Sequence, residues 1–183
     1  MSGSDLLKMV FSDCAVDSKT KHHTMWSVIN LGVNPNDPET YLACAYAFSY
    51  LGADTRREAI VMFEKYFATN PKITIDHINH YSELGKLYES EYLFDKAELC
   101  YIRSAKIWPF HPNYKSYGPH ANRRLGQLYL KQSTQKAIDY WRAIKTSDEY
   151  KSFPKFKKDV DYEYKNALEK HKKGYVYKPR TVK

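Results

Sequence analysis

The feature that most constrains this chain is a spacing of small and aromatic residues that occurs three times along it. In the middle copy a Leu-Gly pair is followed by a Tyr and, beyond a short polar break, by an Ala and a second aromatic residue; these are Leu84, Gly85, Tyr88, Ala97 and Tyr101. Spacings of three and four residues place side chains on one face of an α-helix. The pattern therefore predicts two antiparallel helices that approach closely at the small residues, with the aromatic rings packed beside the crossing.

Two further copies flank the middle one. The upstream copy consists of Tyr46, Ala47, Tyr50, Ala59 and Phe63, and the downstream copy of Leu125, Gly126, Tyr129, Ala137 and Trp141. One helical hairpin cannot bury its own apolar face, so a repeated hairpin predicts an array in which neighbouring hairpins cover one another. The three copies together predict an all-α fold.

The spacing resembles the tetratricopeptide repeat (TPR), in which an aromatic residue, Leu-Gly and Tyr mark the first helix, and Ala, an aromatic residue and Pro mark the second. Tyr81 and Pro109 complete that set in the middle copy, and Pro71 closes the upstream one. The resemblance implies a TPR-like α-solenoid of antiparallel hairpins, in which the first helix of each repeat lines a concave groove. It also implies a domain that works by binding other proteins.

The remaining sequence divides around the repeats, which we place within residues 39–150. Residues 1–38 predict two short helices that form a diverged repeat or an N-terminal cap. Residues 151–174 predict a basic capping helix, which stops at Gly174 and turns an apolar stripe toward the last repeat; the stripe is Phe156, Val160, Tyr164, Ala167 and Leu168. Residues 175–183 lack periodicity and predict a flexible basic tail.

Basic residues concentrate at the C-terminal end of the chain. The formal net charge is +8, and residues 151–183 hold 11 Lys or Arg against 4 Asp or Glu. A lysine-rich surface attracts nucleic acid and other anionic surfaces. We therefore keep, as the alternative function, nucleic-acid or anionic-surface binding through this segment, with a basic surface made of Lys157, Lys158, Lys172 and Lys173.

The motifs that carry catalysis in other proteins do not occur in this sequence. It contains no nucleophile elbow, phosphate-binding loop or Gly-rich dinucleotide fingerprint. His77 and His80 lie three residues apart and could face one metal ion, but catalytic zinc takes three protein ligands and no third is evident. We therefore expect these histidines to be polar residues at a helix start, and we expect no enzymatic activity, no metal and no cofactor.

Cysteine usage and hydropathy bear on where the protein works. Cys14, Cys44 and Cys100 are widely spaced and odd in number, which argues against a disulfide framework. The sequence contains no apolar run near the roughly 18 residues that a membrane span needs. We expect a protein of the reducing cytoplasm, without a membrane span.

The first helix of each repeat has a second face, opposite its packing residues, and in TPR-like arrays this face lines the groove. It changes from aromatic in the first repeat to basic in the third; the residues are Tyr41, Phe48, Asn79, Lys86, His120, Arg123, Arg124 and Gln127. We expect these side chains to point away from the core. Phe48, Lys86, Arg123 and Arg124 should therefore be dispensable for folding.

These features predict a non-enzymatic interaction module, an adaptor or scaffold that binds a peptide segment of another protein in its groove. Arg123 and Arg124 would pair with an acidic side chain or a C-terminal carboxylate of that partner. Self-association through an end of the array, giving a homodimer, is an alternative.

Overall fold

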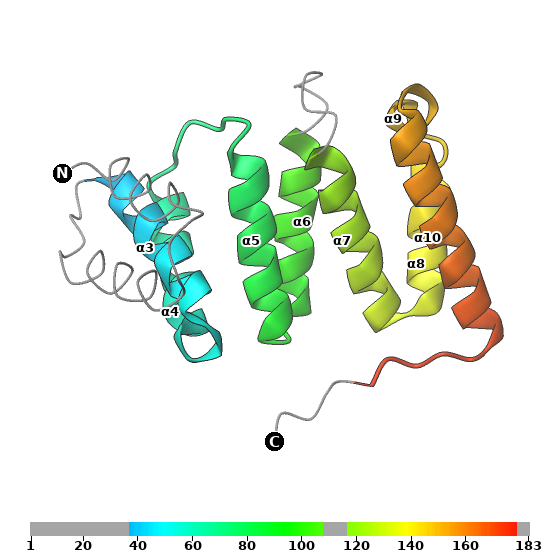
Figure 1. The fold of residues 1–183 in the computed structure, drawn as a ribbon, viewed down its shortest axis with the longest axis horizontal. Coiled ribbons are helices and arrows are strands. Elements are labelled where there is room, and N and C mark those ends of the chain that lie inside the picture. The colour runs from blue at the N-terminus through cyan, green and yellow to red at the C-terminus, as the bar shows by residue number, and fades with distance from the viewer. Residues whose placement is uncertain (1–36, 108–116, 179–183) are drawn as a thin grey trace, which may run out of the picture. The chain divides into compact units, whose positions relative to one another are not determined.

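The computed structural model describes residues 37–107 and 117–178, and for residues 117–120 it describes the backbone alone. Every regular element in these ranges is a helix and none is a strand (Figure 1), which confirms the all-α class. The described residues belong to two compact units, one ending at Ile73 and the other beginning at Thr74.

Two of the predicted segments lie outside the described residues. They are the N-terminal helices, within residues 1–36, and residues 179–183 of the tail. Of the helices in the described part of the chain, none combines the length and the apolar composition needed to cross a bilayer.

The first unit contains the upstream repeat as one hairpin. Helix α3 (Pro38–Leu51) begins after Asp37, whose carboxylate accepts hydrogen bonds from the Glu39 N–H (3.1 Å) and the Thr40 hydroxyl (2.9 Å). The first of these bonds satisfies one of the backbone donors that the first turn of a helix leaves open. A 3-10 turn (Ala53–Thr55) then leads into α4 (Arg56–Ala68), so the two predicted helices and the turn between them are present.

The interior of this hairpin uses the predicted small and aromatic residues. Ala47, Ala59 and Phe63 are fully buried, and the ring of Tyr46 packs edge-on against that of Phe63 with centroids 5.2 Å apart. Alanine on α3 therefore leaves room for an aromatic ring from α4, as the spacing predicts.

Phe48 is a correction to the sequence-based expectation. Its side chain is only 8% exposed, so the prediction that Phe48 points to solvent and is dispensable for folding is wrong. The reason is that α3 is buried on more than one side; its buried residues include Leu42, Ala43, Cys44, Ala45 and Ala47. The expectation from helical spacing requires one buried face and an exposed face opposite it. Helix α3 has no such broad exposed face.

The second unit contains the middle and downstream repeats and the C-terminal helix. Its described helices are α5 (His77–Ser90), α6 (Phe94–Ile107), α7 (Tyr117–Gln132), α8 (Thr134–Ile144), α9 (Asp148–Ser152) and α10 (Pro154–Lys172). Helices α5 and α6 form one hairpin and α7 and α8 the next, with α7 packed against both α5 and α6 (Figure 1). Helix α10 packs against both α7 and α8.

A glycine lies against an aromatic ring in each of these two hairpins. A Cβ built on Gly85 would lie 2.5 Å from Cε1 of Tyr101, and one built on Gly126 would lie 2.0 Å from Cζ2 of Trp141. Both distances are far below van der Waals contact, so each hairpin depends on the missing side chain. The sequence-based prediction of close helix approach at Gly85 is confirmed.

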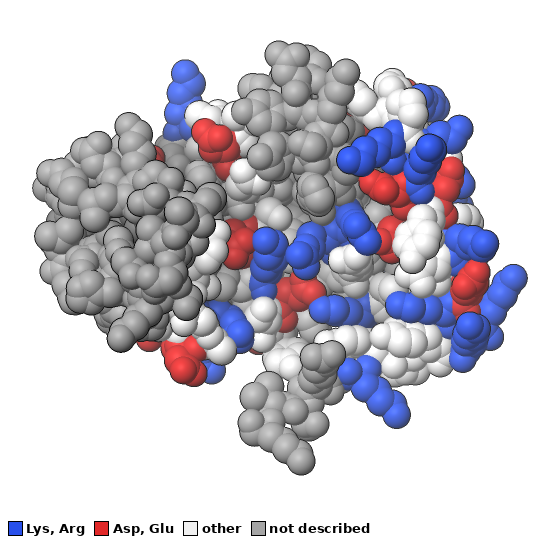
Figure 2. Space-filling model, in the orientation of Figure 1, with Lys and Arg blue, Asp and Glu red and all other residues white. Residues whose placement is uncertain are grey.

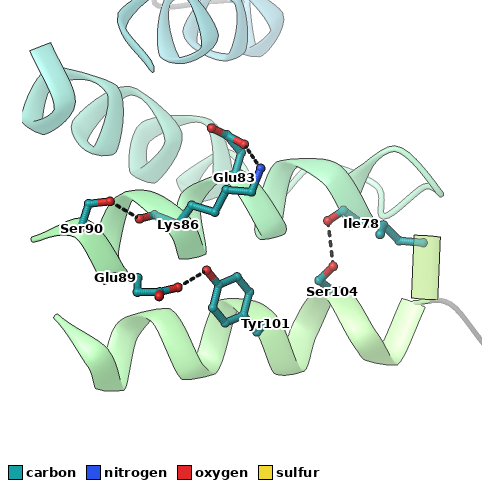
Figure 3. A network of polar contacts seen from close by, with 7 residues as sticks. All are labelled: Ile78, Glu83, Lys86, Glu89, Ser90, Tyr101 and Ser104. Atoms are coloured by element: carbon teal, nitrogen blue, oxygen red, sulfur yellow. Dashed lines mark hydrogen bonds and ion pairs between the residues drawn. The ribbon is translucent and has the colours of Figure 1, made fainter. Parts of the chain in front are cut away.

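Polar contacts fix the ends of the α5–α6 hairpin. The buried Ser104 hydroxyl donates to the Ile78 carbonyl (2.8 Å) near one end, and the Tyr101 hydroxyl donates to Glu89 (2.8 Å) near the other (Figure 3). Because buried polar groups are costly unless they are bonded, these two contacts select one register between the helices.

Helix α10 ends in a glycine turn. Gly174 has a φ of +63°, its N–H donates to the His171 carbonyl, and the Tyr175 N–H donates to the Lys170 carbonyl. This pair of bonds is a Schellman motif, which satisfies the last helix carbonyls and reverses the chain. The segment that follows, through Lys178, has no regular structure and runs from the end of α10 toward α7 (Figure 1).

The glycine contacts make a testable prediction. Alanine has a higher helix propensity than glycine by roughly 1 kcal/mol, yet we expect Gly126→Ala to lower stability because its Cβ overlaps the Trp141 ring. Overpacking of this kind costs about 1–3 kcal/mol. Thermal or urea denaturation measures the effect.

The matched control for this prediction is the same substitution in a Trp141→Phe background. The smaller ring gives the new methyl group room, so the loss from Gly126→Ala should shrink in the double variant. An unchanged or raised melting temperature for Gly126→Ala alone would show that the hairpin is not packed in this way.

Candidate functional site

The most distinctive surface of the second unit is an open groove between α7 and α10. Its volume is about 350 Å³, and the end of α5 and the C-terminal segment complete its walls. We call it the α7–α10 groove; its lining residues are Glu89, Arg123, Arg124, Gln127, Leu130, Lys131, Tyr162, Glu163, Asn166, Lys170, Tyr175 and Tyr177. Figure 2 shows the face on which α5, α7 and α10 lie, where many Lys and Arg side chains gather with fewer carboxylates among them.

A buried carboxylate lies in one wall of the groove. The Glu163 side chain, from α10, is 6% exposed and accepts a hydrogen bond from Nε of Arg123 (2.8 Å) and a longer one from Nε2 of Gln127 (3.5 Å). Arg123 itself is 51% exposed. Because the bond uses Nε, the terminal amino groups of the Arg123 guanidinium are left to face other acceptors.

A second carboxylate connects three helices. Glu89, at the end of α5, accepts from the Tyr101 hydroxyl of α6 and forms an ion pair with Nζ of Lys131 on α7 (Figure 3 shows the Tyr101 contact). Burial raises the pKa of Tyr101, the Glu89 carboxylate raises it further, and the positive charge of Arg124 opposes them. Arg124 is therefore close enough to the Tyr101–Glu89 pair to act on it electrostatically.

Two of the four groove cations, Arg124 and Lys170, differ from the others in their bonding partners. Among the described residues, neither Arg124 nor Lys170 has a carboxylate partner. Nζ of Lys170 lies 4.8 Å from the centroid of the Tyr175 ring, and Nζ of Lys131 lies 5.4 Å from that of Tyr177. The C-terminal segment thus packs its aromatic rings onto groove cations.

The structure brings some of the predicted groove residues together and separates others. Arg123, Arg124 and Gln127 line the α7–α10 groove, which differs from the predicted groove in that α10 forms one of its walls. Asn79 is exposed on α5 and Lys86 is bonded to Glu83 (2.7 Å), and neither lines the groove. Two more predicted residues, Tyr41 and Phe48, belong to the first unit. The side chain of His120 is not among the described side chains.

Sequence reasoning missed nine of the twelve residues that line the groove. Lys131 could have been found, because it follows Gln127 by one helical turn on the same face of α7. Glu163 and Lys170 share a face of α10, but nothing in the sequence says that this face meets α7. Tyr175 and Tyr177 were assigned to a flexible tail, and no periodic signal marks them.

The predicted basic surface on α10 is separate from the groove. Lys157, Lys158, Lys172 and Lys173 are all exposed, and none lines the cavity. Nζ of Lys157 lies 5.6 Å from the centroid of the Tyr150 ring. Lys157 and Lys158 are adjacent on α10, so their side chains point about 100° apart.

The histidine pair is part of the structure of the α5 start. His77 is buried, and its Nδ1 accepts the Thr74 N–H (3.1 Å), while the ring of His80 packs edge-on against it at 5.3 Å. Within the described ranges, no group of three or more His, Cys, Asp or Glu side chains is arranged to hold a metal ion. The contacts therefore favour a structural role.

The two described cysteines, Cys44 and Cys100, are buried and form no disulfide with each other. Burial raises the pKa of the Cys44 thiol, which keeps it protonated and unreactive at neutral pH. Cys14 lies outside the described residues.

Comparison with known proteins adds no relative to this description. No protein-family model matches the chain, and neither the curated proteins nor the solved structures contain a significant match to it. The resemblance to the TPR family therefore depends on the residues of the sequence pattern themselves.

The first prediction from these geometries concerns pH. Burial, with the nearby charge of His77, lowers the pKa of His80 from 6.5 to about 4. Unfolding therefore takes up a proton between these values, so stability is fully present above about pH 6.5 and declines as the pH falls toward 4. The decline is at most about 3 kcal/mol.

Urea denaturation of the wild type and of His80→Gln between pH 6.5 and 4 measures this decline. If the free energy of unfolding falls with pH equally in both proteins, the lowered pKa of His80 is contradicted.

The second prediction compares the two adjacent arginines. Arg123→Ala removes the charged partner of the buried Glu163 carboxylate. In contrast to the expectation from the sequence that Arg123 is dispensable for folding, we therefore expect this change to cost about 1–3 kcal/mol of stability. Arg124→Ala removes an exposed cation with no carboxylate partner among the described residues, and should change stability by less than about 0.5 kcal/mol. Equal melting temperatures for the two variants would contradict the geometry of the groove wall.

Proposed function

We propose that this chain is a non-enzymatic interaction module, an adaptor or scaffold, that binds a segment of a partner protein in the α7–α10 groove. The observation that carries the proposal is the groove itself, which is open, has room for a few side chains, and is lined by four cations against two carboxylates. A partner segment with an acidic side chain or a C-terminal carboxylate complements such a surface.

The packing of the second unit supports the TPR-like part of this proposal. Two successive hairpins bury a glycine from the first helix under an aromatic ring from the second, at Gly85 and at Gly126. Repeat arrays are built from such equivalent units, and their first helices together line the binding surface. In this unit the corresponding first helices are α5 and α7, and both contribute to the groove.

The walls of the groove also suit a peptide. Tyr162 is 67% exposed and Tyr175 is 40% exposed, so both rings are accessible to a ligand in the groove. Exposed tyrosines beside arginine are typical of protein-binding surfaces, because they give large contact area with little loss of conformational entropy. Leu130 supplies an apolar contact between them and the cations.

Binding is favoured over catalysis by the state of the two carboxylates. Glu89 and Glu163 accept hydrogen bonds from groove cations and from neutral donors, and these contacts hold them as structural acceptors. Cys44 and Cys100 are buried and form no disulfide with each other, which fits a reducing compartment, and we propose the cytoplasm.

The test is an affinity capture from a lysate of the native host with the full chain as bait. We expect Arg124→Glu to lose the partners that the wild type retains, because it reverses a groove charge while leaving the Glu163 contact intact. A charge-assisted arginine contact contributes about 1.5–3 kcal/mol, roughly tenfold or more in affinity. Arg142→Glu, on the exposed face of α8 outside the groove, is the matched control.

Two outcomes would contradict the proposal. Retention of the same partners by Arg124→Glu would show that the groove is not the binding surface. Loss of the captured proteins on nuclease treatment, together with a steep fall of retention with salt, would favour the alternative, nucleic-acid binding through the exposed lysines of α10.

A further inference from the structure

We propose that the α7–α10 groove selects a partner segment that carries a phosphorylated serine or threonine. This inference rests on the proposed function, peptide binding in the groove, and goes beyond it by naming the chemical group that the groove cations recognise. The observation behind it is that Arg124 and Lys170, two cations without carboxylate partners among the described residues, share one cavity with an arginine held by a buried carboxylate.

The first argument is the charge balance of the groove. Four cations and two carboxylates line it, which leaves a surplus of two positive charges. Glu163 is paired with Arg123 and Glu89 with Lys131, so the surplus is located at Arg124 and Lys170. A phosphate monoester carries about −1.5 to −2 charges at neutral pH. One phosphate neutralises the surplus, whereas one carboxylate neutralises only half of it.

The second argument is the orientation of Arg123. Its Nε is bound to Glu163 at 2.8 Å, and Gln127 bonds the same carboxylate oxygen from the same face of α7. An arginine fixed at Nε has its guanidinium plane set before a ligand arrives, so less conformational entropy is lost when the terminal amino groups bind an oxyanion. Glu163 therefore acts as a positioning residue for Arg123 rather than as a contact for the ligand.

The third argument separates a single phosphate group from a nucleic-acid strand. A strand presents one phosphate at every nucleotide, whereas the groove has a surplus of only two positive charges, because Glu89 and Glu163 already pair with Lys131 and Arg123. A peptide carries one phosphate and lets its neighbouring residues contact Tyr162, Tyr175 and Leu130. The mixture of charges and exposed rings thus fits a phosphopeptide better than a polyanion.

The test uses short synthetic peptides as probes, with fluorescence anisotropy as the measurement and the full chain as the protein. One degenerate pool carries phosphoserine or phosphothreonine at its centre, and matched pools carry Ser or Thr, one Glu, or two adjacent Glu residues there. We expect the phosphorylated pool to bind at least about tenfold more tightly than the single-Glu and unmodified pools, since it alone offers a dianion to several donors at once.

The variants locate the preference in the groove. Arg124→Ala with Lys170→Ala should reduce binding of the phosphorylated pool to the level of the unmodified pool. The control is Arg142→Ala with Lys151→Ala, which removes the same charge from exposed positions outside the groove and should leave the preference unchanged. Circular dichroism melting of both double variants shows whether each is folded.

The outcomes distinguish this inference from the proposed function. If the phosphorylated and glutamate pools bind the wild type equally, and Arg124→Ala with Lys170→Ala abolishes both interactions, the phosphate preference is overturned and peptide binding in the groove stands. A single-stranded RNA oligomer that binds where no peptide pool does would overturn both. Phosphopeptide binding that survives the groove variant but not the control variant would place the site elsewhere and would also contradict the inference.

Discussion

The close contact between a glycine and an aromatic ring is the interaction on which the second unit depends. At Gly85 and at Gly126 the ring of the next helix occupies the space that a side chain would need. This contact sets the distance between the two helices of each hairpin, and with it the direction in which every other side chain points. Since protein interiors are densely packed and shift little, a hairpin with a wider crossing would not bury Tyr101 or Trp141 in the same way.

The charged groove is a consequence of that packing. Tyr101 lies over Gly85 and, from that position, its hydroxyl reaches Glu89, which in turn pairs with Lys131 on the next hairpin. Helix α10, packed on α7 and α8, then brings Glu163 to Arg123. The buried carboxylate of Glu163 and the partly buried one of Glu89 are stable here because each is bonded by one cation and one neutral donor. The cations that they leave without carboxylate partners give the groove its positive surplus, and the proposed ligand chemistry follows from this surplus.

Much of this could be predicted from the sequence, and the reasons why the rest could not are specific. The spacing of small and aromatic residues predicted the hairpins, because the helical period and the size of each side chain can be read from neighbouring residues in the sequence. The same period placed Arg123, Arg124 and Gln127 on one face of α7. It failed at Phe48, since α3 is buried on more than one side. It did not predict that Tyr50 is 62% exposed while Tyr88 and Tyr129, at the same position of the pattern, are buried. It missed Glu163 and Tyr175 because a contact between distant segments leaves no periodic signal.

The measurement that tests this account most directly is nuclear magnetic resonance of the Hα protons of the two helix-crossing glycines. Protons in close contact with an aromatic ring are displaced by its ring current from their ordinary helical resonance positions, and they show nuclear Overhauser effects to that ring. We predict ring-current-shifted Hα resonances for Gly85 and Gly126, with cross-peaks to Tyr101 and Trp141 respectively. Resonances of both glycines at ordinary helical positions, without cross-peaks to either ring, would contradict the packing from which the groove is derived.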